Sequence, residues 1–249
     1  MKGRLTSDHW LINVPIAHRG LFDDNYPENT MPAYEQAIKH GYAIEMDVQM
    51  SSDGVLFCYH DNNALRVCGV DKDVREMAYE EIKTLRPCGK EYPIMTFEEF
   101  LNFVDGRTPI LVEVKDQKKR KGIEQKITDC LRNYKGQFAV QSFNPIIVKR
   151  FEKIAPEFLR GVLTTRVNGM NVPKIVMSFM THFGFKHFIK LDFLNENIDD
   201  LEINQKYSKN YYVVTFTIKT DADVLKAEKY AHNIIFEKTA TNLGKFENK

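Results

Sequence analysis

Short apolar runs rich in β-branched and aromatic residues recur along the whole chain, and segments with helical periodicity separate them. Runs of this length with helices between them are typical of parallel strands joined by βαβ crossovers. We predict eight such strands, and a further run at 55–60 follows the second of them closely. The eight predicted strands are 14–18, 42–48, 109–115, 137–143, 158–163, 187–191, 211–217 and 233–237.

This order of elements predicts an α/β protein with a (β/α)8 TIM barrel. A doubly wound open sheet is the alternative, but no GxGxxG turn follows the first predicted strand. No Gly/Ser/Pro-rich linker divides the 249 residues, so a single barrel domain over 1–249 is expected. The stretch 61–92 is too long for a simple βα loop and contains weak helical periodicity in "REMAYEEIKTL". We therefore predict a small insertion there, after the second strand region.

Two helices have clear boundaries in the sequence. In "NTMPAYEQAIKHG", Asn29 or Thr30 is the candidate N-cap and Gly41 follows the last turn. In "TFEEFLNFVDG", Thr96 is the candidate N-cap, two acidic residues occupy the first turn, and Gly106 follows the end. Both segments are predicted to connect parallel strands.

Composition excludes several classes of protein. Lys and Arg number 35 against 34 Asp and Glu, and this balance argues against a nucleic-acid partner. The basic run "KDQKKRK" at 115–121 is expected to form a solvated loop, apart from Lys115.

The sequence contains neither a secretory signal pattern nor an apolar run long enough to span a bilayer, so no stable membrane anchor is expected. Four cysteines without CxxC spacing favour free thiols and a cytoplasmic location, and the oligomeric state stays open.

Acidic side chains lie inside two of the predicted strands. Alternation in "AIEMDVQM" places Glu45 and Asp47 on one face of a strand that otherwise looks buried. In "PILVEVK", Glu113 and Lys115 share a face. Buried like charges are costly unless something neutralises them, so Glu45, Asp47 and Glu113 are expected to converge on one divalent cation. Ligation by oxygen alone suits Mg²⁺ or Ca²⁺ better than zinc.

Short sequence blocks in five stretches of the chain occur in an order and spacing typical of one enzyme family. They are carried by "IAHRGLFDDNYPENT", "IEMDVQMSSDGVLFCYHD", "YPIMTFEEFL", "ILVEVK" and "VQSFNP", between about Ile16 and Pro145. In these blocks the chain resembles the glycerophosphodiester phosphodiesterase family. The resemblance implies a (β/α)8 barrel, an oxygen-ligated divalent metal, and cleavage of small glycerophosphodiesters to glycerol 3-phosphate and an alcohol.

Two histidines in these blocks suit proton transfer near neutral pH. We assign His18 as the general base and His60 as the general acid; the resemblance supports the pair better than the order. Arg19 and Lys115 are expected to hold the anionic oxygens of the phosphate. The nucleophile is left open between water and the glycerol hydroxyl of the substrate.

The match to the family pattern weakens in the second half of the chain. "FTIK" replaces a WTVN-like segment, which puts Phe216 in the aromatic position, and Glu237-Lys238 replaces a TD pair. Gln141 and Phe216 are predicted to contact the substrate, whose alcohol portion stays open. Glu28 in "PENT" either reaches the site or holds its loop and starts the following helix.

Other functions compete with this interpretation. A phospholipase D-like barrel would act instead on lysophospholipids or sphingolipids. A non-catalytic ligand-binding barrel would predict loss of the acid/base or metal set, and the sequence retains both. Taken alone, Glu113 and Lys115 could form a structural ion pair, and His18 could cap a helix or satisfy a buried carbonyl. Their occurrence together at successive strand ends favours the catalytic interpretation.

Overall fold

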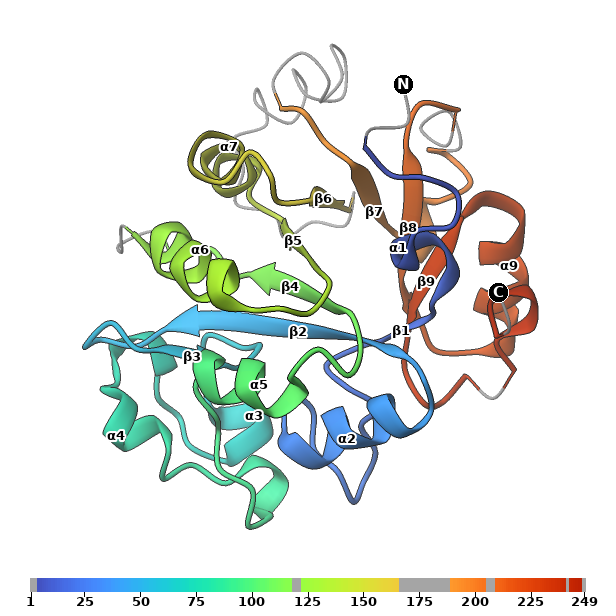
Figure 1. The fold of residues 1–249 in the computed structure, drawn as a ribbon. Coiled ribbons are helices and arrows are strands. Elements are labelled where there is room, and N and C mark those ends of the chain that lie inside the picture. The colour runs from blue at the N-terminus through green and yellow to red at the C-terminus, as the bar shows by residue number, and fades with distance from the viewer. Residues whose placement is uncertain (1–3, 118–121, 166–188, 205–208, 241, 248–249) are drawn as a thin grey trace. The chain divides into compact units, whose positions relative to one another are not determined.

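The computed structural model describes residues 4–117, 122–165, 189–204, 209–240 and 242–247. The chain divides into two compact units, and we describe each by itself (Figure 1). The first unit comprises residues 17–138. The second comprises residues 1–16 and 139–249.

The sheet of the first unit is built around β2 (Ala43–Met50), all of whose residues are buried. As Figure 1 shows, β2 runs between β3 (Leu56–Cys58), which is antiparallel to it, and β4 (Ile110–Val114), which is parallel. The parallel register pairs Asp47 with Glu113. Paired residues of neighbouring strands point to the same face, so the register alone brings these two carboxylates together.

Both helices with clear sequence boundaries form in this unit. They are α2 (Met31–Lys39) and α5 (Phe97–Val104), and the ring of Tyr34 packs edge-on against that of Phe100 at 4.7 Å. Thr96 and Glu99 make the reciprocal bonds of a capping box at the start of α5. The last helix of the unit is α6 (Ile123–Asn133).

The predicted insertion at 61–92 consists of four short helices. They pack around an apolar cluster of their own, which also includes Phe57 of β3. This packing anchors the insertion to the sheet of the first unit. The helices are α3 (Leu65–Cys68), η1 (Val74–Glu76), α4 (Tyr79–Ile82) and η2 (Pro87–Gly89). The buried members of the cluster are Phe57, Tyr59, Ala64, Val67, Val74, Met77, Ile82, Leu85 and Ile94.

In the second unit, five strands pair side by side and in parallel in the order β5–β6–β7–β8–β9. Helix α7 connects β5 to β6, and α9 connects β8 to β9, as expected for βαβ crossovers. The strands are β5 (Phe138–Ser142), β6 (Arg160–Thr164), β7 (Phe193–Asn197), β8 (Tyr212–Ile218) and β9 (Asn233–Phe236). The other elements among the described residues are α7 (Pro145–Ile154), α9 (Asp221–Tyr230), η4 (Ile198–Asp200), η6 (Gly244–Phe246) and, near the N-terminus, α1 (Trp10–Asn13) and β1 (Ile16–Ala17).

One predicted strand is wrong. Residues 189–191 of the predicted strand 187–191 are irregular, 187–188 lie outside the described residues, and the strand instead occupies Phe193–Asn197. Its buried Asn195 donates its amide to Gln141 Oε1 at 2.8 Å, and its buried Glu196 accepts from the Thr164 hydroxyl at 3.3 Å. Other strands supply partners for the Asn195 amide N–H and the Glu196 carboxylate, so the strand can bury polar side chains. Its sequence therefore lacks the apolar run that predicts a buried strand. Residues 118–121 of the basic run also lie outside the described residues.

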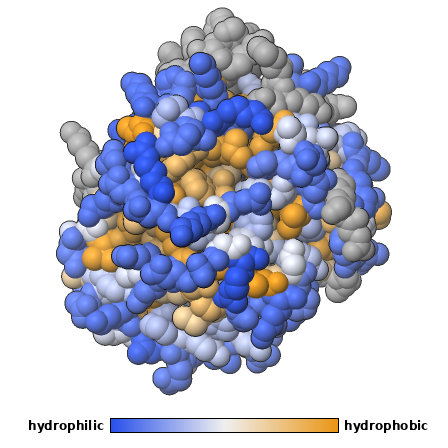
Figure 2. Space-filling view, viewed as in Figure 1, coloured by the Kyte–Doolittle hydropathy of each residue, from blue (hydrophilic) through white to orange (hydrophobic). Residues whose placement is uncertain are grey.

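Polar side chains cover most of the face shown in Figure 2, with smaller apolar areas between them. Among the residues that the structure describes, none of the helices combines the length and the apolar character needed to cross a membrane. Of the described residues, the large apolar side chains that are exposed are scattered over both units: Met31, Leu65, Val70, Ile146, Ile203 and Leu225.

Candidate active site

Three acidic side chains predicted to lie together do so. Glu45 and Asp47 come from β2 and Glu113 from β4, and one carboxylate oxygen of each lies within 4.8 Å of the others. All three are buried. The register of β2 with β4 and the two-residue period of a strand account for this convergence.

Glu45 and Asp47 differ in how strongly their surroundings favour the charged form of the carboxylate. Burial raises the pKa of Glu45 well above its ordinary value, and the charges of Asp47 and Glu113 raise it further. Burial would raise the pKa of Asp47 as well, but the charges of Lys115, His60 and Arg19 outweigh it and hold that pKa below its usual range. Of Glu45 and Asp47, Asp47 is therefore the carboxylate whose negative charge its neighbours stabilise more.

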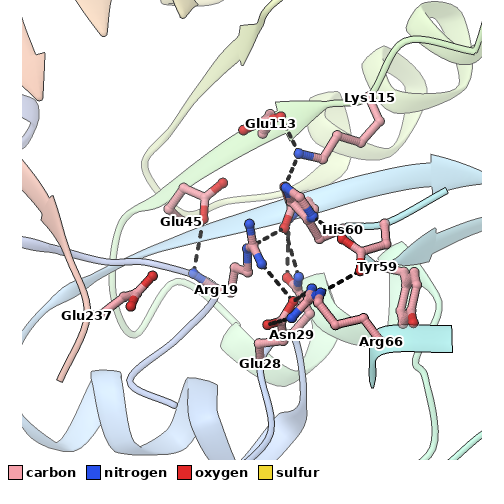
Figure 3. Close-up of polar contacts among 12 residues, drawn as sticks. Arg19, Glu28, Asn29, Glu45, Tyr59, His60, Arg66, Glu113, Lys115 and Glu237 are labelled. Carbon is pink, nitrogen blue, oxygen red and sulfur yellow. Dashed lines mark hydrogen bonds and ion pairs between the residues drawn. The ribbon is translucent and has the colours of Figure 1, made fainter. Parts of the chain in front are cut away.

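Two cationic side chains contact these acids, as Figure 3 shows. Lys115 Nζ lies 2.7 Å from Asp47 Oδ1 and also contacts Glu113 Oε1. Arg19 Nε lies 3.3 Å from Asp47 Oδ2. Burial lowers the pKa of Lys115, but the charges of Asp47 and Glu113 more than offset this and raise it overall. Both groups predicted to hold phosphate oxygens thus lie at the acidic cluster.

The turn after β1 holds Arg19 through its backbone as well. Its peptide N–H donates to Glu45 Oε2 at 3.0 Å, and its φ of 56° is left-handed. Gly20 follows with φ of 81°, and a Cβ there would lie 2.8 Å from the carbonyl carbon of Ala33 in α2. The turn therefore needs glycine both for its conformation and for its close approach to α2.

We expect Gly20→Ala to lower the free energy of unfolding by about 2–4 kcal/mol. The added Cβ would be strained in the left-handed conformation and would also lie too close to the backbone of Ala33. Gly41→Ala is the matched control: its φ is 74° but a Cβ there meets nothing within 4 Å. It should cost only about 1 kcal/mol. Urea unfolding of both variants measures the difference, and equal losses would contradict the steric part of the argument.

His60 lies in the segment that leaves β3. Its Nδ1 lies 2.5 Å from Asp61 Oδ1, so the ring nitrogen faces a carboxylate that can fix its orientation. The buried amide of Gln49 in β2 donates to the carbonyl oxygens of Tyr59, His60 and Asp61 at 2.9, 3.1 and 2.8 Å. Gln49 thus ties the histidine segment to the strand that carries two of the acids, a role that sequence reasoning missed.

Residues of the "PENT" loop reach the cluster. Asn29 donates its amide to Asp47 Oδ2 at 2.8 Å and accepts from the Asp47 peptide N–H and the Tyr34 hydroxyl. Asn29 is therefore not the N-cap of α2; that position belongs to Thr30, which makes no side-chain cap bond. Glu28 Oε1 accepts from Arg19 Nη1 at 2.8 Å, so Glu28 contacts a predicted site residue.

The other predicted site residues lie as follows. His18 comes directly after β1 and before Arg19, is half-buried, and has its ring 6.5 Å from that of Phe22. In the second unit, Gln141 accepts from the amide of Asn195. Phe216 packs edge-on against Phe143 with ring centroids 5.7 Å apart.

A model of the glycerophosphoryl diester phosphodiesterase family matches residues 18–237. This span contains the acidic cluster, the cationic side chains of Arg19 and Lys115, and both histidines. The chain belongs to this family. The predicted assignment to these enzymes is thereby confirmed.

One relative in sequence and two solved structures are similar to this chain. A glycerophosphodiester phosphodiesterase of Bacillus altitudinis is 34% identical over 187 residues, which cover 70% of this chain and 75% of the relative. The crystal structure of a glycerophosphodiester phosphodiesterase from Parabacteroides distasonis has a TM-score of 0.74 at 21% identity and covers 90% of this chain and 93% of its own. A phosphodiesterase of Oleispira antarctica, solved with the product sn-glycerol 3-phosphate, has a TM-score of 0.74 at 20% identity, with 93% and 95% covered.

These structural likenesses confirm the predicted (β/α)8 barrel fold for this family member.

One further residue, Arg66 of the insertion, contacts both Glu28 and Asp61. Sequence reasoning missed it because an arginine in a weakly helical stretch has no local pattern that distinguishes it from a solvated surface residue.

Proposed function

We propose that this chain hydrolyses water-soluble glycerophosphodiesters to glycerol 3-phosphate and an alcohol, with one divalent cation and two histidines. The proposal rests on the buried cluster of Glu45, Asp47 and Glu113 with Arg19 and Lys115 against it. Membership of the phosphodiesterase family supports the reaction class. We also propose that both units belong to one barrel domain, since the fold neighbours cover 90% or more of the chain.

The donor set of the cluster fits a hard cation. It offers carboxylate oxygens, all buried and close enough together to share one ion, and such oxygens are the ligands that Mg²⁺ and Ca²⁺ prefer. The Lys115 ammonium in contact with two of the three acids indicates that the cluster attracts positive charge. Glu45, Asp47 and Glu113 would hold the ion. When bound, it would offset negative charge on the phosphoryl group.

The remaining residues act on the substrate directly. Arg19 and Lys115 bind the anionic phosphate oxygens, Arg19 with a planar fork of donors and Lys115 as a point charge. His18 accepts the proton of the nucleophile, and His60 delivers one to the alkoxide that leaves as the P–O bond breaks. Asp61 holds His60 through Nδ1, which leaves Nε2 as the nitrogen that exchanges a proton with the substrate. Gln141 and Phe216 are the further residues proposed to contact the substrate.

Removal of divalent cations tests this function. We expect protein treated with a chelator to release no glycerol 3-phosphate from glycerophosphocholine, glycerophosphoethanolamine or glycerophosphoglycerol, and Mg²⁺ or Ca²⁺ to restore the release. Enzymatic detection of glycerol 3-phosphate measures it, and calorimetric titration of the chelated protein with each cation measures binding separately.

The control substrate is a lysophosphatidylcholine micelle. Choline release from lysophosphatidylcholine alone would favour the phospholipase D-like alternative. Cation binding without cleavage of any diester would favour the ligand-binding barrel. Release of glycerol 3-phosphate that is unaffected by the chelator would exclude the cation from the reaction.

A further inference from the structure

Arg66 uses each of its guanidinium nitrogens on a carboxylate. Nη1 and Nη2 donate to the two oxygens of Glu28 at 2.8 and 2.7 Å, a bidentate pair, and Nε donates to Asp61 Oδ2 at 2.6 Å. This side chain comes from α3 in the insertion, and Figure 3 shows it beside Glu28 and close to His60. A planar fork that holds two carboxylates at once requires arginine.

Each of those carboxylates also holds a residue of the proposed machinery. Glu28 Oε1 accepts from Arg19 Nη1 at 2.8 Å, and Asp61 Oδ1 lies 2.5 Å from His60 Nδ1. Arg66 is thus separated by one carboxylate from the proposed phosphate-binding arginine and by another from the proposed general acid.

The exposed fractions distinguish this network from an ordinary surface ion pair. The side chains of Glu28 and Asp61 are 11% and 22% exposed, whereas that of Arg66 is 52% exposed. Burial raises the pKa of Glu28, but its bonds to Arg66 and the charges of Arg66 and Arg19 more than offset this and lower it. Arg66 therefore covers two largely buried acids from the solvent side.

The packing of the insertion fixes where Arg66 lies. Its neighbour Val67 is buried in the apolar cluster of the insertion, and the Cys68 sulfur lies 3.8 Å from the Tyr59 hydroxyl. At the start of α3, the Leu65 N–H donates to Asn63 Oδ1. These contacts hold α3 in place. The guanidinium of Arg66 is therefore held near Glu28 and Asp61 by the position of the helix itself.

We propose that Arg66 is a positioning residue for the hydrolysis stated above: through Asp61 it fixes the orientation of the His60 ring, and through Glu28 it fixes Arg19. The proposal rests on the proposed function and gives the insertion a role in the reaction. The alternative is that Arg66 only fastens the insertion to the "PENT" loop. In that case its removal would change stability and leave the histidine and the turnover number unaffected.

A matched pair of variants separates these roles. Arg66→Met removes the contacts described above. Arg75→Met removes another arginine of the insertion, which pairs with Asp73 through Nε at 2.8 Å and Nη2 at 2.5 Å. We expect kcat for glycerophosphocholine to fall about 10- to 100-fold in Arg66→Met, as for other residues that orient catalytic groups, and to change less than about twofold in Arg75→Met.

Two further variants show how Arg66 acts. Arg66→Lys should restore only part of the lost kcat, because one ammonium cannot hold both carboxylates. If Arg66 works through Asp61, adding Arg66→Met to Asp61→Asn should reduce kcat by much less than it does in the wild-type chain. Fully additive losses in kcat would overturn the positioning role through Asp61.

A spectroscopic measurement does not depend on activity. With ¹⁵N-labelled histidine, the ring signals of His60, assigned by their absence from His60→Ala, should shift in Arg66→Met and stay in place in Arg75→Met. Unchanged His60 signals together with wild-type kcat in Arg66→Met would overturn the proposal while leaving the proposed function intact. Failure of the wild-type protein to cleave any glycerophosphodiester would instead overturn the proposed function.

Discussion

We expect the Asp47→Asn protein to bind Mg²⁺ and Ca²⁺ at least about 100-fold more weakly than the wild-type chain and to turn over glycerophosphocholine about 10³-fold more slowly. Asparagine has the same shape, but it removes the charge that pairs with Lys115 and Arg19. It also replaces one of the three carboxylates that would hold the ion. Calorimetric titration and glycerol 3-phosphate release measure the two losses independently.

Asp192→Asn is the control for this variant. Asp192 is also a buried carboxylate paired with an arginine, since its Oδ2 lies 2.8 Å from Arg4 Nη2, but it lies outside the acidic cluster. Its replacement should lower stability without changing cation affinity. An Asp47→Asn protein that binds either cation as tightly as Asp192→Asn does would refute the proposed metal site.

We expect His18→Ala and His60→Ala each to lower kcat by about 10²- to 10⁴-fold, the usual contribution of a positioned acid or base. Cation affinity should stay within about threefold in both, because neither histidine belongs to the carboxylate cluster. The exposed His40 at the end of α2 supplies the control variant, His40→Ala, which should retain full activity.

The choice of leaving group separates the two roles. A glycerophosphodiester of 4-nitrophenol releases a stable phenolate that needs little protonation, so His60→Ala should lose far less activity on it than on glycerophosphocholine. His18→Ala should lose the same factor on both substrates. The reverse pattern would exchange the assignments of acid and base, and losses that do not depend on the leaving group in either variant would exclude acid catalysis by these residues.

Local pattern predicted the acidic cluster because its geometry depends on short-range rules. Alternation along β2 places Glu45 and Asp47 together, and pairing of β2 with β4 adds Glu113. The helix boundaries of α5 followed from its capping residues in the same way. Where strand alternation, parallel strand pairing or a capping residue determines the geometry, the sequence alone was sufficient.

Residues whose roles depend on distant partners were missed. Asn29 was one of two candidate N-caps but binds Asp47, and Gln49, which no local pattern singled out, holds three carbonyl oxygens. Arg66 contacts a residue 38 positions away in the chain. The strand β7 was misplaced for a related reason, because the partners of its buried polar side chains come from other strands.

The polar face of β2 carries Glu45, Asp47 and Gln49 at every second position, while Ile44, Met46 and Val48 are buried on its other side. Deleting or adding a single residue within this strand would reverse its two faces, so both acids and the anchor of the histidine segment would be lost in one event. The length of β2 is therefore under a stricter constraint than its individual apolar residues, which can exchange for others of similar size. The insertion that follows β3 can vary in length more easily, provided that an arginine still reaches Glu28 and Asp61.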